Sequence, residues 1–145
     1  MLRLAPAVYE AILAHAREAA PAEACGLLAG NRPGGTAPGP GTAATETYRA
    51  TNVAPNPEIT YEIDPEEQYR LMDDIESAGL ELVGFYHSHP AGPHGPSSTD
   101  HARATWEGYH YLIASLGGDR PVLDAWVWTG DRFARDEVAL ADDNG

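Results

Sequence analysis

The amino-acid sequence predicts an α/β fold in which a mixed β-sheet packs against helices. Helical and strand-like patterns alternate up to residue 89, and three strand-like patterns follow one another after residue 108. Alternating helices and strands favour parallel pairing, whereas consecutive strands favour antiparallel pairing, so a mixed sheet of the α/β or α+β class suits both halves. The chain has 145 residues, 43% of them hydrophobic, which suits a single domain spanning residues 1–145.

The N-terminal part of the chain predicts a helix, a buried strand and a loop. Residues 6–20 begin with a proline, which the first turn of a helix tolerates, and carry apolar residues at helical spacing. Residues 22–31 are apolar and stop at a glycine, as expected of a short buried strand. Residues 32–43 are so rich in glycine and proline that they predict a loop without regular structure.

Two strands and a second helix are predicted next. Residues 45–53 and 59–63 contain β-branched and aromatic residues on either side of a Pro-Asn-Pro turn, which indicates strands. Residues 64–79 begin with Asp64 as a candidate N-cap and Glu67 at the position that closes a capping box, which indicates a helix. The apolar residues expected on its buried face are Tyr69, Met72 and Ile75.

The remaining elements surround a polar loop. Residues 80–89 are apolar and β-rich up to a polar end, which predicts a buried strand that runs into a Gly/Pro-rich loop. A short helix is expected near residues 98–107. Three further strands are expected near residues 109–116, 122–129 and 132–140.

Charge and composition exclude several classes of function. The chain has 22 acidic and 9 basic residues and a net charge of -13, which disfavours nucleic acid and anionic lipid as partners. A single cysteine excludes an internal disulfide, and no signal peptide is evident. No apolar run reaches the roughly 20 residues needed to span a bilayer. We therefore expect a soluble protein of the cytoplasm; the oligomeric state is left open.

His87 and His89 stand at the polar end of the predicted strand 80–89. Side chains alternate along a strand, so both imidazoles leave the same face and can bind one ion. Asp100 begins the next helix, and the Gly/Pro-rich loop between them favours a compact turn that returns it to the histidines. Catalytic zinc uses three such ligands and leaves the fourth position to water, whereas structural zinc is usually closed by four cysteine-rich ligands. The sequence therefore predicts a catalytic zinc site.

Hydrolysis of an amide also needs a group that accepts a proton from water and delivers it to the leaving nitrogen. Glu23 is the candidate because it is an acidic residue at the edge of an otherwise apolar strand, where burial would raise its pKa. A structural ion pair with an arginine is the alternative for this glutamate. Cys25 would share its strand face and is expected to be a core residue.

This set of residues resembles the signature of the JAMM (MPN+) metalloproteases, in which a distant Glu precedes His-x-His-Pro, six residues and Ser-x-x-Asp. Here HSHP at residues 87–90 is followed by six residues and then by SSTD at residues 97–100, and the glutamate lies in PAEACGLLAG. The resemblance implies that His87, His89 and Asp100 bind Zn²⁺, that Glu23 is the general acid/base, and that Ser97 donates a hydrogen bond to the oxyanion.

The resemblance also implies a fold and a substrate class. The implied fold is a cytidine-deaminase-like sandwich, with a mixed curved β-sheet packed between helices. The implied activity is hydrolysis of the amide bond after the C-terminal Gly-Gly of a ubiquitin-like or sulfur-carrier protein, as in small stand-alone prokaryotic members. The 45 residues after Asp100 leave little room for the insertions of larger eukaryotic members. The alternatives are a zinc hydrolase of small amides and a non-catalytic interaction scaffold of the same fold.

Other residues of this segment have plainer interpretations. Ser97 could act only as a helix cap, although Ser98 or Thr99 is the expected cap. His94 lies in the loop and His101 follows the aspartate with a different side-chain direction, so neither is expected to be a ligand.

Overall fold

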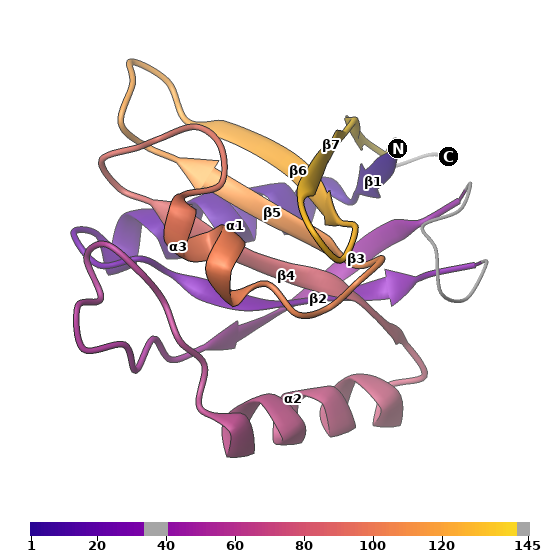
Figure 1. The fold of residues 1–145 in the computed structure, drawn as a ribbon. Helices are drawn as coiled ribbons and strands as arrows, with labels where there is room; N and C mark the ends of the chain where they lie inside the picture. Colours follow the sequence, from indigo (N-terminus) through magenta and orange to yellow (C-terminus); the bar gives the residue numbers. More distant parts are fainter. Residues whose placement is uncertain (34–40, 142–145) are drawn as a thin grey trace.

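The computed structural model describes residues 1–33 and 41–141. In these residues the strands form one mixed sheet, and helices pack against it (Figure 1). The elements in chain order are β1 (Leu2–Leu4), α1 (Pro6–Ala19), β2 (Cys25–Asn31), β3 (Ala43–Ala50), α2 (Pro65–Ser77), β4 (Glu81–His89), α3 (Ser98–Arg103), β5 (His110–Ser115), β6 (Val122–Trp128), β7 (Phe133–Asp136) and β8 (Val138–Leu140). The strand order in the sheet is β7-β6-β5-β4-β2-β3-β1-β8.

The sheet curves until its two ends meet. Strands β7 and β8 lie at opposite ends of the strand order, yet they are separated in the chain by Glu137 alone. The Leu2 N–H donates to the Glu137 carbonyl over 2.7 Å, which ties β1 to the β7–β8 junction. Figure 1 shows β7 beside β1 as a result. The mixed, nearly barrel-like sheet confirms the predicted α/β class.

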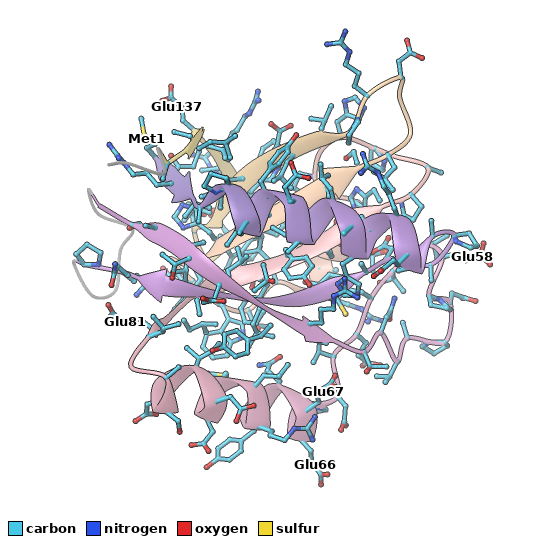
Figure 2. The ribbon with its side chains drawn as sticks, turned by 180° about the vertical axis from the view of Figure 1, so that it is seen from behind. Met1, Glu58, Glu66, Glu67, Glu81 and Glu137 are labelled. Carbon is cyan, nitrogen blue, oxygen red and sulfur yellow. The ribbon has the colours of Figure 1, made fainter. Side chains whose placement is uncertain are left out.

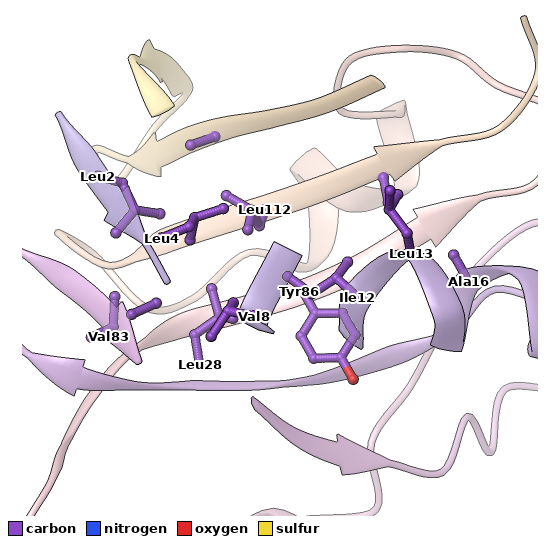
Figure 3. Packing of buried hydrophobic residues seen from close by; sticks show 13 residues of the cluster. Leu2, Leu4, Val8, Ile12, Leu13, Ala16, Leu28, Val83, Tyr86 and Leu112 are labelled. Atoms are coloured by element: carbon purple, nitrogen blue, oxygen red, sulfur yellow. The ribbon is translucent and has the colours of Figure 1, made fainter. Parts of the chain in front are cut away.

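The first hydrophobic core lies between α1 and one face of the sheet. Val8 and Ile12, one helical turn apart, pack with Leu28, Tyr86 and other apolar side chains of the strands (Figure 3). Adjacent residues of a strand point to opposite faces, so Leu27 lies in the other core. Because each face of the sheet is covered by a core, the central strands β2 and β4 carry apolar side chains on both faces.

The second core lies between α2 and the opposite face of the sheet. Leu71 and Ile75, four residues apart on α2, pack with Leu27, Phe85 and Trp128. The expected buried face of this helix was partly wrong, because Tyr69 is 76% exposed and Leu71 is buried. The sheet therefore lies between helices, as expected.

The start of α2 also differs from its prediction. Asp64 occupies the N-cap position, but within the described chain its side chain makes no capping hydrogen bond. Glu67 does not close a capping box, because its carboxylate accepts hydrogen bonds from the main chain and the hydroxyl of Thr51. Proline at the first helical turn and acidic residues in that turn remain as local helix-start signals.

Several helices and strands begin or end at other residues than predicted. Strand β2 begins at Cys25, so Glu23 precedes the ladder. Residues 59–63 do not form a strand; their only ladder-type contact in the described chain is a single bridge between Asn52 and Ile63. The helix expected at residues 98–107 ends at Arg103, and the strand expected at 132–140 is divided at Glu137. Most of the predicted loop 32–43 lies outside the described residues.

Most acidic side chains of the described residues are exposed, whereas Glu23 and Asp100 are buried. Glu58, Glu66, Glu81 and Glu137 extend outward from different parts of the molecule (Figure 2). Among the helices of residues 1–33 and 41–141, none is long and apolar enough to cross a membrane.

Candidate metal centre

Strand pairing brings the segment before β2 to the end of β4. The two strands are antiparallel, and Cys25 is the partner of His87 in the register. The Ala24 N–H donates to the Ser88 hydroxyl over 2.8 Å, and the Ser88 N–H donates to the Ala24 carbonyl over 3.0 Å. Ser88 thus holds the residue next to Glu23, while the alternation of the strand turns the two histidines to the other face.

Four predicted site residues form one buried cluster. The Nε2 atoms of His87 and His89 are 3.2 Å apart, and the Asp100 Oδ2 atom lies 3.1 Å from the first and 3.0 Å from the second. Glu23 completes a group whose ligand atoms all lie within 4.8 Å of one another. None of the four residues is more than 7% exposed. In the part of the chain that the structure describes, no other group of histidine, cysteine and carboxylate side chains meets this spacing.

Asp100 is directed into the cluster by the start of α3. Its carboxylate Oδ2 accepts from the Ser97 N–H over 2.9 Å, and its own N–H donates to the Ser97 hydroxyl over 3.1 Å, which completes a capping box. Ser97 is therefore the N-cap, and the expectation that Ser98 or Thr99 caps the helix was wrong. The physical reason is reciprocal bonding with the residue three positions on. The bond uses a lone pair of the hydroxyl and leaves its hydrogen able to donate.

Burial and hydrogen bonding set the protonation of the ligand candidates. Burial lowers the pKa of His87, although its bond to Asp100 opposes the shift. For His89, burial is outweighed by bonds to Asp100 and the Pro93 carbonyl, and the pKa rises. Burial would raise the pKa of Asp100, but hydrogen bonds from both histidines hold it well below its usual range. The cluster thus favours an ionised carboxylate facing two imidazoles.

Glu23 has the protonation behaviour of an acid/base group. Burial raises its pKa to about 7; the nearby His89 lowers it and Asp100 raises it further. Its Oε1 atom is buried and has no hydrogen-bond partner among the described residues. A carboxyl group with a pKa near neutrality can accept a proton in one step and donate it in the next.

The donor set fits a small divalent cation. Three donor atoms separated by 3.0–3.2 Å approach the roughly 3.3 Å expected between ligands around tetrahedral zinc. With a cation bound, the His89 Nδ1–H would keep its 2.8 Å bond to the Pro93 carbonyl, and its Nε2 atom, which otherwise donates to Asp100, would give up that proton and offer its lone pair to the metal. Two imidazole nitrogens and a carboxylate are ligands that zinc accepts.

Three nearby residues, His94, His101 and Cys25, are not part of the cluster. The ring of His101 instead packs edge-on against Trp128. Cys25 is fully buried, and burial raises the pKa of its thiol to about 12, so it remains protonated. It packs as a core residue, as expected.

A pocket of about 380 Å³ opens beside the cluster. His87 and Asp100 form part of its wall, together with the aromatic side chains of Tyr61, Phe85, Trp106, Tyr111 and Phe133. The ring of Tyr61 stacks on that of His87, with 4.5 Å between centroids and 26° between planes. Sequence reasoning missed Tyr61 because its segment was assigned to a strand. The volume and the aromatic lining of the pocket can receive apolar groups of a ligand next to the cluster.

A family model described as prokaryotic homologs of the JAB domain matches residues 5–129. The chain belongs to this family. This chain is 46% identical over 143 residues to a protein of Haloferax volcanii named desampylase, and the alignment covers 96% of each chain. It is 34% identical over 110 residues to the probable TtuB-protein conjugate cleaving protease of Thermus thermophilus, covering 76% of this chain and 67% of the relative.

Solved structures agree on the fold. A solution structure of a Desulfitobacterium hafniense protein, 34% identical, aligns with a TM-score of 0.87 over 99% of this chain and 94% of its own. A JAB1/MPN domain protein from Archaeoglobus fulgidus aligns with a TM-score of 0.62 over 98% of each chain. At 18% identity, the second structure supports the fold alone. The resemblance read from residues 87–100 is thereby confirmed at the level of family and fold.

Proposed function

We propose that this JAB-domain protein is a zinc-dependent peptidase that hydrolyses the amide bond after the C-terminal Gly-Gly of a small ubiquitin-like or sulfur-carrier protein. The observation that carries the proposal is the buried cluster of two histidines and two carboxylates beside an aromatic pocket. The names of its relatives, a desampylase and a conjugate-cleaving protease, support the same reaction class.

The roles we assign follow from position and chemistry. His87, His89 and Asp100 would hold the metal, since their donor atoms face one another at 3.0–3.2 Å. Zinc at this place would supply Lewis acidity, lowering the pKa of a water and polarising the scissile carbonyl. Glu23, with its pKa near 7, accepts the proton of the attacking water and delivers it to the leaving amine. Ser97 uses its free hydroxyl hydrogen to stabilise the oxyanion.

A Gly-Gly sequence suits the approach to this centre. The cluster is buried and the pocket wall is built of large aromatic rings, so residues next to the scissile bond must be narrow to bring their main chain close to the ligands. Glycine carries no side chain that would collide with these walls. The pocket beyond the centre can then hold the bulkier residues that precede Gly-Gly.

The test is mass spectrometry of a ubiquitin-like sulfur carrier that bears a C-terminal extension after Gly-Gly. The zinc-loaded protein should release the extension, and the Glu23→Gln variant should bind zinc equally but cleave at least about 100-fold more slowly, because the amide cannot accept the proton. Cleavage of small amides alone would indicate the alternative hydrolase. Bound zinc without cleavage of either substrate would indicate a scaffold.

A further inference from the structure

The side chain of Asn52 connects Glu23 to the loop that follows β3. Its Nδ2 group donates to the Glu23 carbonyl over 3.0 Å, and its Oδ1 atom accepts from the Glu62 N–H over 3.1 Å. Further bonds join the amide to the carbonyls of Pro57 (3.3 Å) and Thr60 (3.0 Å) and to the N–H of Ala54 (3.0 Å). A primary amide offers two N–H donors and two acceptor lone pairs. The three carbonyls therefore share two N–H groups, with Pro57 at the longest distance, and the Oδ1 atom accepts two bonds.

The main chain of Glu23 is held by this same loop at both of its peptide groups. The Glu23 N–H donates to the Pro57 carbonyl over 2.7 Å, and its carbonyl accepts from Asn52. Glu23 precedes β2 and so has no partner in the ladder, whereas the next residue, Ala24, is fixed by Ser88. The orientation of the Glu23 side chain toward the cluster therefore depends on loop 51–64.

Loop 51–64 also forms a wall of the pocket. It carries Tyr61, whose ring stacks on His87, and Ile63, which bridges back to Asn52. The bonds of Asn52 to the main chain of residues 54, 57, 60 and 62 fold this loop on itself. The Asn52 side chain thus fixes the position of both the Glu23 main chain and the loop that forms the pocket wall.

We propose that Asn52 is a positioning residue, which holds the Glu23 main chain and loop 51–64 in register so that the Glu23 carboxyl group faces the metal ligands. The inference rests on the proposed function for its kinetic consequence, while its structural part stands on the hydrogen bonds alone. Asn52 is 29 residues from Glu23 in the chain, and its amide does not contact the ligands themselves. It acts on the placement of the base rather than on metal binding.

The decisive variant is Asn52→Asp. It preserves the size and the acceptor atoms of the side chain, removes both N–H donors, and places a negative oxygen against the carbonyls of Glu23, Pro57 and Thr60. The matched control is Asn56→Asp, an exposed position of the same loop that undergoes the same change of charge. Asn52→Ser, which keeps one hydroxyl donor without adding charge, covers the case in which the aspartate variant does not fold.

The expected kinetic result is a fall in kcat of about 100-fold for Asn52→Asp, the size expected when a catalytic group is misplaced by about 1 Å. Zinc affinity, measured against a chromogenic chelator, should stay within about threefold of wild type, since the three ligands keep their own contacts. Asn52→Ser should lie between the two, and Asn56→Asp should match wild type. An unchanged kcat, a loss of zinc binding in parallel with kcat, or an equal effect of Asn56→Asp would each overturn the inference.

Hydrogen exchange of the metal-free protein tests the structural part without any substrate. In both Asn52 variants, the N–H of Glu23, whose acceptor Pro57 loses its bond to the Asn52 amide, should exchange at least about tenfold faster, while the N–H of Ala24, which is bonded to Ser88, should keep its protection. Unchanged protection of the Glu23 N–H refutes the role of Asn52 even if the wild type cleaves its substrate. If the wild type cleaves nothing, the proposed function fails and this measurement still decides whether Asn52 holds the loop.

Discussion

Replacing Ser97 by alanine and by glycine separates its two possible roles. As the N-cap of α3, its hydroxyl accepts from the Asp100 N–H over 3.1 Å. Alanine at an N-cap costs about 1 kcal/mol, whereas glycine costs only a few tenths. For a domain of this size, 1 kcal/mol corresponds to a fall in Tm of about 3 °C. Both substitutions remove the same hydroxyl hydrogen, so they differ in capping but not in the loss of the oxyanion donor.

The expected outcome is that stability and activity do not change in parallel. Thermal unfolding should show Ser97→Ala clearly below wild type and Ser97→Gly close to it. Cleavage of the extended carrier under single-turnover conditions should be slower by about 100- to 1,000-fold in both, equivalent to about 2.7–4 kcal/mol of lost transition-state stabilisation. Zinc content should remain unchanged, because the Ser97 N–H still bonds to Asp100 in both variants.

Two results would refute this reasoning. If Ser97→Gly retains more than half of the wild-type rate, Ser97 serves as a cap and the oxyanion has another donor. If the loss of rate follows the loss of zinc in both variants, Ser97 acts by holding Asp100 in the metal centre. Measuring the rate at saturating zinc distinguishes the second result from the first.

The remaining predictions concern the metal centre and the cores. Asp100→Asn should weaken zinc binding by more than about 100-fold. At 100 times the wild-type Kd, the stabilisation by zinc should then fall from about 2.7 kcal/mol to below about 0.4 kcal/mol, and a thermal shift on zinc addition equal to wild type would contradict this. Gly84→Ala should cost about 3 kcal/mol in urea unfolding, because a Cβ atom would lie 2.0 Å from the His110 carbonyl oxygen where β4 and β5 pair; a loss under 1 kcal/mol would show that the strands separate easily. Tyr86→Phe removes the 2.7 Å bond to His15 and should cost about 1 kcal/mol without changing zinc affinity, and a change in zinc affinity would show that this bond reaches the site.

The elements predicted well are those whose signals are local. Residues 6–20 form a helix at Pro6–Ala19, and the run 80–89 forms β4 at Glu81–His89. Proline at a helix start, apolar side chains at regular spacing and glycine at the end of an element are signals carried by the segment itself. The spacing of His87, His89 and Asp100 was informative for the same reason, since a strand and a short turn bring these side chains together.

The elements predicted poorly depend on partners elsewhere in the chain. The segment 59–63 has the composition of a strand, but Asn52 donates to its Thr60 carbonyl and accepts from its Glu62 N–H. Its Tyr61 ring stacks on His87. The strand expected at 132–140 divides because the curved sheet needs its last residues at the opposite end, beside β1. The residue composition of a segment shows whether it can adopt an extended conformation. Whether it forms a strand depends on which sheet edge is within reach for hydrogen bonding.

The sequence by itself determined the α/β class, the order of most elements and the histidine and carboxylate residues that the fold brings together in a group able to hold a metal ion. Those properties follow from periodicity, charge and ligand chemistry, which are local to the residues. Only the tertiary structure decided that Ser97 caps α3, that Glu23 lies before β2 beside the histidines, and that Asn52 and Tyr61 belong to the surroundings of the centre. The Ser97 cap is a local choice among three neighbouring candidates, made by its reciprocal bonds with Asp100. The other contacts join residues that are far apart in the chain, and they depend on sheet register and loop closure, which no single segment encodes.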